Sequence, residues 1–162
     1  MQMLCFALGL LLPTAIQRQP ASPRTEPPFR AARGAFVALS VADLRATSQW
    51  YAEKLSLTVI MDMPKKDGAA VTVLEGGGLT VELLQLDNAV ALRQAAPQAT
   101  GAQQVHGIFK VGLVVEQFDQ TVAALRARGV EIAHGPFPRR GNQRANVIIK
   151  DNNGNLLQFF GK

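Results

Sequence analysis

Side chains that commonly carry catalysis are sparse in this chain. It has two histidines, His106 and His134, and one cysteine, Cys5. His106 precedes an apolar run that predicts a strand, and His134 stands in an Ala-His-Gly-Pro segment that predicts a loop, so we expect both to be exposed to solvent. A centre of two histidines and one carboxylate would require both to converge on the same acidic residue. Spacing alone therefore indicates no histidine or thiolate metal centre.

Other chemistries are excluded by the motifs that are missing. No Gly-x-Ser-x-Gly occurs, so there is no nucleophile elbow. The triple glycine Gly76–Gly78 is followed by neither Lys-Ser/Thr nor a helix pattern, and it predicts a hairpin turn rather than a phosphate loop. The densest basic cluster, Arg139, Arg140 and Arg144, has no interleaved aromatic residues. With a net charge of only +5, we expect no nucleic-acid partner.

The first 33 residues differ in composition from the rest. Residues 3–12 form an apolar run that is too short to span a bilayer but matches the core of a signal peptide. We predict a signal peptide or apolar leader over residues 1–21 and a Pro-rich linker over residues 22–33. Export to the periplasm or the medium follows, with no stable membrane span after processing. Because no Lys or Arg precedes the apolar run, a cytoplasmic protein with a wrongly assigned start codon is the alternative.

Residues 34–162 are predicted to form one domain, in which two segments repeat the same order of elements. Asp43 is a suitable helix N-cap, and Gly129 fits the left-handed end of a second helix. The strand-like runs of the first segment cover residues 35–41, 57–61, 69–74 and 79–85. Those of the second segment cover residues 108–115, 130–133, 144–150 and 156–160. The fold class is therefore α+β, with two tandem βαβββ modules whose sheets form a concave cup.

The module boundaries follow from these runs. Module one covers about residues 35–86 and module two about residues 107–161. The connector, residues 87–106, is rich in Ala and Gln and is predicted to contain a short helix or to act as a lid.

At two places the sequence resembles the vicinal oxygen chelate superfamily of glyoxalases, bleomycin resistance proteins and extradiol dioxygenases. Val41-Ala-Asp-Leu44 leads into Trp50–Leu57, which is similar to the family's FYxxxLGL helix end, with Ser56 in place of Gly. Leu125–Val130 and Lys150–Gln158 resemble the family's LkarGv and DPdGnxxE motifs. The resemblance implies the cup fold and, in metal-dependent members, a divalent ion held by four side chains.

Alignment on these motifs places the four metal positions at Phe36, Glu82, Lys110 and Gln158. Phenylalanine has no donor atom and an ammonium group has no lone pair, so the resemblance implies a degenerate metal site. We expect no cofactor; a weakly held Mg²⁺ or Mn²⁺ is the alternative.

Strand alternation adds Ser40 and Phe160 to the inner face, giving an apolar cup with a few polar groups. The predicted ligand-binding residues are Phe36, Ser40, Glu82, Lys110, Gln158 and Phe160. The leading hypothesis is a binding protein for a small organic molecule, which forms either a monomer or a homodimer. The second is a lyase or isomerase in which Glu82 and Lys110 are the candidate catalytic residues, and the third is a scaffold whose cup is filled by contact between Phe36 and Phe160.

Overall fold

A computed structural model describes residues 34–162 of the chain. The leader and linker predicted for residues 1–33 lie outside the described residues. In the part of the chain that is described, no helix has both the length and the apolar character needed to cross a membrane.

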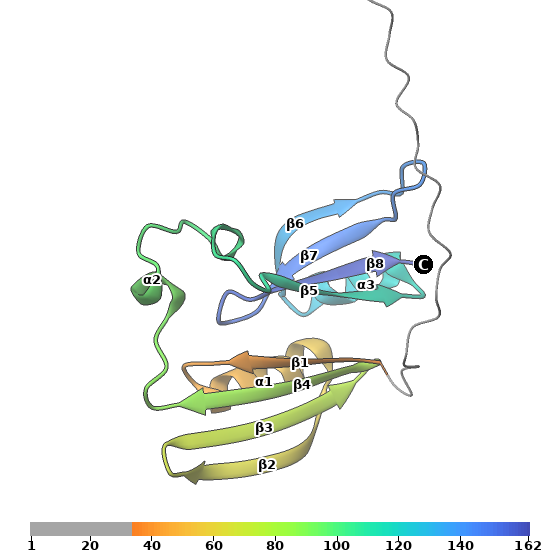
Figure 1. The fold of residues 1–162 in the computed structure, drawn as a ribbon. Coiled ribbons are helices and arrows are strands. Elements are labelled where there is room, and N and C mark those ends of the chain that lie inside the picture. Colours follow the sequence, from red (N-terminus) through yellow and green to blue (C-terminus); the bar gives the residue numbers. More distant parts are fainter. Residues whose placement is uncertain (1–33) are drawn as a thin grey trace, which may run out of the picture. The chain divides into compact units, whose positions relative to one another are not determined.

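Module one is a four-stranded sheet with one helix (Figure 1). Its elements are β1 (Ala35–Ser40), α1 (Leu44–Leu55), β2 (Thr58–Lys66), β3 (Ala69–Gly76) and β4 (Leu79–Leu86). The strand order is β1-β4-β3-β2, with β1 parallel to β4 and the other pairs antiparallel.

Module two repeats this arrangement. Its elements are β5 (Lys110–Val115), α3 (Phe118–Ala127), β6 (Glu131–Phe137), β7 (Asn146–Lys150) and β8 (Leu156–Gly161). The order is β5-β8-β7-β6, again with only the first pair parallel. The connector contains the short helix α2 (Leu92–Ala95) and a 3₁₀ turn at Ala102–Gln104. The predicted pair of βαβββ units is confirmed.

Local sequence explains where the two long helices begin and end. The Asp43 carboxylate accepts a hydrogen bond from the Ala46 N–H at 2.9 Å, which caps the start of α1. The chain leaves α1 through Ser56, whose φ of 56° is left-handed, and it leaves α3 through Gly129 with a φ of 65°. Both predicted capping positions are therefore confirmed.

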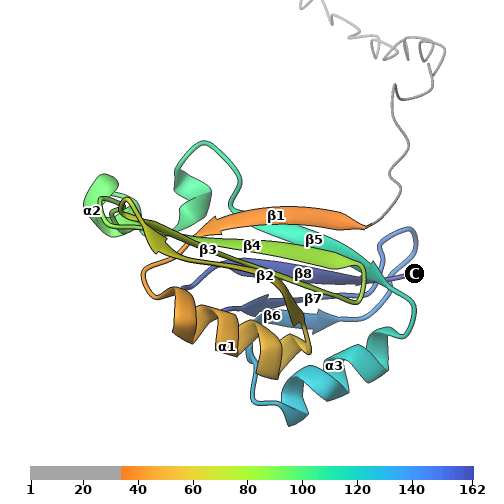
Figure 2. The same ribbon diagram turned by 90° about the horizontal axis from the view of Figure 1, so that it is seen from below.

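Each sheet is covered by a helix on one face only. Helix α1 contacts β2, β3 and β4, and α3 contacts β6 and β8, so the helices define a core side (Figure 2). Alternate strand residues face this side, and those of both modules belong to one apolar cluster, which includes Leu74, Val81, Leu83, Val147 and Ile149. We call the opposite face of each sheet its cup face.

Three predicted boundaries were wrong. Strand β2 continues to Lys66, beyond the predicted end at residue 61, and β5 begins at Lys110 rather than Ile108. The segment around His134 is part of β6 and not a loop. Strands β2 and β6 contain Pro64 and Pro136, and both lie at sheet edges, where a residue without an N–H is tolerated.

Candidate functional site

The cup face of module one is defined by its cross-strand pairs. Residues opposite one another in neighbouring strands project to the same side of a sheet. The pairs that contain predicted site residues are Phe36–Thr80, Ala38–Glu82 and Ser40–Leu84. Because the residues between them in β4, such as Val81 and Leu83, are buried in the core, Phe36, Ser40 and Glu82 lie on the cup face.

The same reasoning applies to module two. Its corresponding pairs are Lys110–Leu156, Gly112–Gln158 and Val114–Phe160. The intervening residues Leu157 and Phe159 are buried in the core. Lys110, Gln158 and Phe160 therefore lie on the cup face of the second sheet, as the strand alternation indicated.

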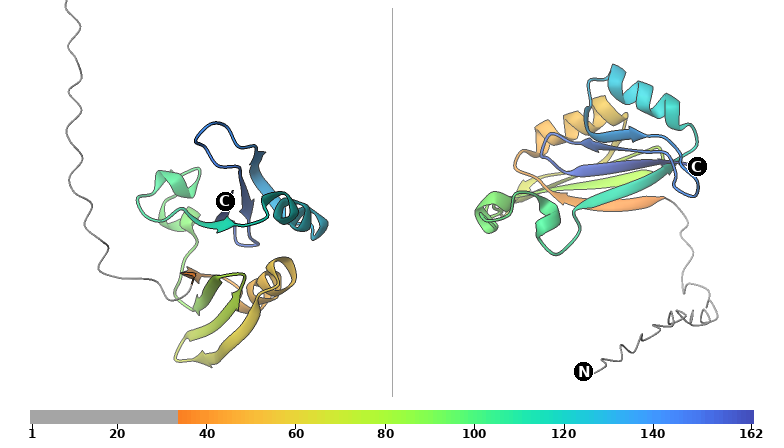
Figure 3. Two further views of the ribbon diagram at one scale, coloured as in Figure 1. Left: turned by 90° about the vertical axis from the view of Figure 1, so that its right-hand side faces the viewer. Right: turned by 90° about the horizontal axis from the view of Figure 1, so that it is seen from above.

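Strands β1 and β5 are neighbouring edges of the two sheets in all three views (Figures 1, 2 and 3). No backbone ladder joins them, and the space between their side chains forms a cavity of about 400 Å³. Phe36 and Lys110 line this cavity together with Ala38, Ile108 and Phe109. We call the space between β1 and β5 the seam. A smaller cavity of about 180 Å³ along the seam is lined by Phe36, Gly112 and Gln158.

Two residues of the seam were not predicted as part of the site. Ile108 is 89% exposed and Phe109 is 40% exposed, and both precede β5. The apolar run at residues 108–115 predicted them as part of the strand itself. The signal that could have identified them is an aliphatic residue followed by an aromatic one, Ile108 and Phe109, directly before the strand. Ser40 and Glu82 line neither seam cavity.

Glu82 and Lys110, the two candidate catalytic residues, do not form an ion pair. Within residues 34–162, neither side chain has a hydrogen bond or ion pair. Ala38 lies beside Glu82 on β1 and separates it from the seam. The Lys110 Nζ instead lies 5.3 Å from the centre of the Phe109 ring, within the range of a cation–π contact.

Gln158 is the most buried polar residue of the cup face of module two, with 8% of its surface exposed. Its Nε2 donates to the Oδ1 of Asn146 at 2.9 Å. Asn146 in turn donates from Nδ2 to the main-chain oxygen of Arg144 at 3.2 Å. Since both Gln158 and Asn146 stand on the cup face, this pair of amides links the centre of the sheet to the β6–β7 connection.

The histidines are not gathered at this site. His106 and His134 are both exposed. His134 pairs with Ile148, which pairs with Gln158, so it lies on the outer edge of the cup face. In the described residues no three His, Cys, Asp or Glu side chains are grouped closely enough to hold a metal ion.

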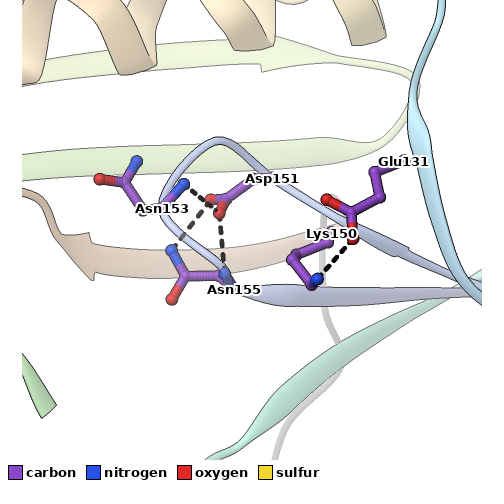
Figure 4. A network of polar contacts seen from close by, with 5 residues as sticks. All are labelled: Glu131, Lys150, Asp151, Asn153 and Asn155. Atoms are coloured by element: carbon purple, nitrogen blue, oxygen red, sulfur yellow. Dashed lines mark hydrogen bonds and ion pairs between the residues drawn. The ribbon is translucent and has the colours of Figure 1, made fainter. Parts of the chain in front are cut away.

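A buried polar network positions β8 from behind. The Tyr51 hydroxyl on α1, which is fully buried, donates to the Asp151 carboxylate at 3.0 Å. Asp151 also accepts from the backbone N–H groups of Asn153 and Asn155 and from the Asn155 side chain (Figure 4). Burial, and then the neighbouring Asp151 charge, raises the pKa of Tyr51 above its usual value of 10.0. The contact joins the helix of module one to the β7–β8 hairpin of module two.

Two further contacts hold this hairpin. The Asn153 Nδ2 donates to the Thr47 hydroxyl at 2.8 Å, so the turn is attached to α1 a second time. Lys150, which precedes Asp151, forms an ion pair with Glu131 on β6 (Figure 4). The strand that carries Gln158 and Phe160 therefore starts from a fixed turn.

The two aromatic residues of the predicted site are separate. Phe36 lies at the seam, whereas Phe160 lines a different cavity of about 860 Å³ near the β6–β7 connection. In residues 34–162 the ring pair in contact is Trp50 with Tyr51, and Phe36 and Phe160 form none. The observation that would have favoured a scaffold with a filled cup is therefore missing from the described part.

Comparison with known proteins identifies relatives of this fold. Residues 34–159 match the profile of the Glyoxalase/Bleomycin resistance protein/Dioxygenase superfamily. A search of curated proteins finds no match to the sequence.

Several solved structures are similar. A glyoxylase/bleomycin resistance protein/dioxygenase domain from Frankia sp. EAN1pec has a TM-score of 0.63 at 17% identity, covering 82% of this chain and 93% of that one. A glyoxalase family protein from Enterococcus faecalis has a TM-score of 0.60 at 20% identity, covering 82% and 98%. TnmS3, an antibiotic-binding protein from Streptomyces sp. CB03234, has a TM-score of 0.55 at 16% identity, also covering 82% and 98%. At these identities the likeness is one of fold.

Proposed function

Because the chain belongs to the glyoxalase/bleomycin resistance protein/dioxygenase superfamily, we propose that it binds a small organic ligand in its cup without a metal ion. The observation that carries this proposal is the cavity between β1 and β5, which is lined by Phe36 and Lys110 at two of the positions where the family resemblance implies metal ligands. Apolar walls with a few polar groups are the usual composition of small-molecule sites.

The donor set at the four positions does not suit a transition-metal ion. Phe36 has no donor atom, and the protonated Lys110 has no lone pair to give. Glu82 and the carbonyl oxygen of Gln158 remain, whereas zinc and non-haem iron sites use three or four protein ligands. An ammonium group beside the seam would also repel a dication. We therefore assign no step to a metal.

One structural neighbour supports a binding role. TnmS3 is described as an antibiotic-binding protein, so this fold serves binding in at least one case. Transfer of that role to this chain is our proposal, and it rests on the seam cavity and not on identity, which is 16%.

A second candidate function is a lyase or isomerase in which Glu82 and Lys110 act on the ligand, with or without a weakly held divalent ion. The half-buried carboxylate of Glu82 favours it, because within residues 34–162 this group has no hydrogen-bond or ion-pair partner. A carboxylate in that setting is available to accept a proton. Turnover that is lost in Glu82→Gln, with the fold intact, would select this alternative.

Metal analysis tests the degenerate site. We expect the purified protein to retain less than stoichiometric metal after incubation with Zn²⁺, Ni²⁺, Mn²⁺ or Fe²⁺. The triple variant Phe36→His, Lys110→His, Gln158→Glu restores the family's donor set and should bind about one equivalent of Zn²⁺. Stoichiometric metal in the unmodified chain, lost on Glu82→Ala, would overturn the metal-free proposal.

Ligand screening by thermal shift tests the cavity. Ala38→Trp should fill the seam and abolish the shifts, since Ala38 lines the cavity from β1. Ala123→Trp, at an exposed position on α3, is the matched control and should leave them unchanged. Equal shifts in both variants would place the ligand elsewhere.

We further propose that the mature domain is exported and that it forms a homodimer. The edge strand β2, whose Val59, Ile60 and Met63 are all exposed, supports the second point. Light scattering after size exclusion and fractionation of the producing cell test the two proposals.

A further inference from the structure

A basic and aromatic pocket lies at the end of the cup face of module two. The cavity of about 860 Å³ is lined by Phe137, Arg140, Arg144, Asn146 and Phe160, and no acidic residue of the described chain lines it. Phe137 pairs with Asn146, and Asn146 pairs with Phe160, so these three side chains share the cup face. The two arginines come from the β6–β7 connection.

The two guanidinium groups of the pocket have no hydrogen-bond or ion-pair partner among the described residues. Within residues 34–162, neither Arg140 nor Arg144 has a side-chain hydrogen bond or ion pair, whereas the neighbouring Arg139 donates to the main-chain oxygen of Lys162. The backbone that carries Arg140 is nevertheless fixed. The Arg140 N–H donates to the Gln143 carbonyl at 3.1 Å and the Gln143 N–H donates back at 2.9 Å, which closes a tight turn.

Phe160 supplies a flat apolar wall. A Cβ placed on Gly112 would lie 3.1 Å from the Cε2 of the Phe160 ring, so the ring leans over Gly112 because that residue has no side chain. The Phe137 ring is half-exposed on the same face. A flat ligand can therefore lie against the aromatic rings while its end reaches the arginines.

The pocket lies on the same sheet face as the predicted site residues of module two. The amide of Asn146 receives the Gln158 N–H and donates to the Arg144 main-chain oxygen, so it joins the basic turn to the centre of the cup face. A ligand in the pocket thus lies on the same sheet surface as the proposed site.

From this geometry we infer that the chain takes an organic acid with a flat apolar body, whose carboxylate is bound by Arg140 and Arg144. The inference rests on the proposed binding function and names its ligand class. A guanidinium presents parallel N–H donors that match both oxygens of a carboxylate, and aromatic walls favour a flat body over a small hydrophilic anion. The amides Asn142 and Gln143, which also line the cavity, can hydrogen-bond to further polar groups of such a ligand.

The test compares 2-naphthoate with 2-naphthamide, which share one shape and differ in charge, and adds inorganic phosphate as an anion without an apolar body. Binding to the full chain is measured by calorimetry. We expect naphthoate to bind at least tenfold more tightly than naphthamide, and phosphate to bind least. Arg140→Gln and Arg144→Gln should each weaken naphthoate at least threefold and leave naphthamide unchanged.

Arg126→Gln is the matched control, because Arg126 is an exposed arginine on α3 outside the pocket and its loss changes the net charge equally. Equal losses of naphthoate binding in Arg126→Gln and Arg144→Gln would overturn the inference, since they would reflect net charge alone. Thermal melting of each variant establishes that it is folded.

The remaining outcomes separate this inference from the proposed function. One outcome would keep the binding function and overturn the acid-specific pocket. In it, naphthoate and naphthamide bind with equal affinity, Ala38→Trp abolishes binding of both, and the arginine substitutions change neither affinity. Absence of binding by either probe overturns the ligand class proposed here and leaves the seam cavity to the wider thermal-shift screen.

Discussion

Modules one and two have the same strand order, the same pairing directions and one helix each, yet their cup faces differ in chemistry. The central pair is Ala38–Glu82 in module one and Gly112–Gln158 in module two. Module one offers a carboxylate among apolar side chains, whereas module two offers amides and, at its far end, two arginines. The two cup faces therefore offer different polar groups to a ligand.

The core side shows much less divergence. Val81 and Leu83 of β4, and Leu157 and Phe159 of β8, occupy corresponding buried positions and belong to one apolar cluster. Burial of alternate residues fixes the strand register, because a shift by one residue would turn every apolar side chain outwards. The opposite positions carry no such constraint, and they can differ between modules without loss of the fold.

The strongest test of this comparison breaks the contact that joins the modules. Asp151→Ala would leave the Tyr51 hydroxyl and three N–H donors of the β7–β8 turn without their acceptor. A buried donor without a partner costs about 1–3 kcal/mol, which applies in full to the Tyr51 hydroxyl and in part to the donors of the turn, so we expect a loss of about 3 kcal/mol in the free energy of unfolding. Urea denaturation measures it, with Asn142→Ala, at an exposed position in the β6–β7 connection, as control. A loss below about 1 kcal/mol in Asp151→Ala would mean that the Asp151 contacts contribute little to joining the modules.

The pH dependence of stability isolates the Tyr51 hydroxyl. Tyr51 is the only tyrosine of the chain, and burial raises its pKa above 10.0 in the folded state. Above pH 10 the unfolded chain releases this proton and the folded chain keeps it. The contribution of Tyr51 to the free energy of unfolding is therefore fully present below pH 10 and is lost as the pH rises. The slope from this group is about 1.4 kcal/mol per pH unit.

The Tyr51→Phe variant should lack this slope and keep the part of the pH dependence that Lys and Arg side chains contribute. The measurement is the unfolding free energy of both proteins between pH 9 and pH 11. Parallel curves for the two proteins would show that Tyr51 ionises as readily in the folded chain as in the unfolded one.

Much of the fold could be predicted from the sequence because it depends on local and periodic signals. Asp43 marks a helix start through its side-chain carboxylate and Gly129 marks a helix end through its left-handed backbone, and the strands of the two modules follow apolar alternation. The predicted ends of β2 and β6 failed because register shifts within both strands let pairing continue past the apolar runs. A bulge is set by pairing with a neighbouring strand and leaves little trace in the sequence.

The candidate site could be predicted only as two faces. The family resemblance placed Phe36 and Glu82 in module one and Lys110 and Gln158 in module two. The distance between the two pairs depends on how two sheet edges meet. The structure puts Ala38 between Glu82 and the seam, so Glu82 forms no ion pair with Lys110. Arg140 and Arg144 become a pocket only because the turn places them beside Phe160, which is distant in sequence.

The ends of the two helices allow an exchange between modules. Ser56 after α1 and Gly129 after α3 both have left-handed φ values, 56° and 65°. A side chain in this region costs about 1 kcal/mol relative to glycine. Ser56→Gly should raise the free energy of unfolding by about 1 kcal/mol, and Gly129→Ser should lower it by a similar amount. Chemical denaturation of the two variants and of the double exchange checks this, and a destabilised Ser56→Gly would point to a role for the serine hydroxyl.

The smallest expected effect concerns a reciprocal contact at the same helix ends. The Lys54 Nζ donates to the main-chain oxygen of Arg128 at 2.6 Å, and the Arg128 Nη1 donates to that of Lys54 at 3.1 Å. Both bonds are exposed, so Lys54→Met and Arg128→Met should each cost about 0.5 kcal/mol. Because each side chain bonds to the other residue's backbone and not to its side chain, either bond survives removal of the other. A double-mutant cycle should therefore give additive losses, with a coupling energy near zero. A coupling energy of about 1 kcal/mol would mean that the two bonds form only together, and that the modules are joined here as one cooperative contact.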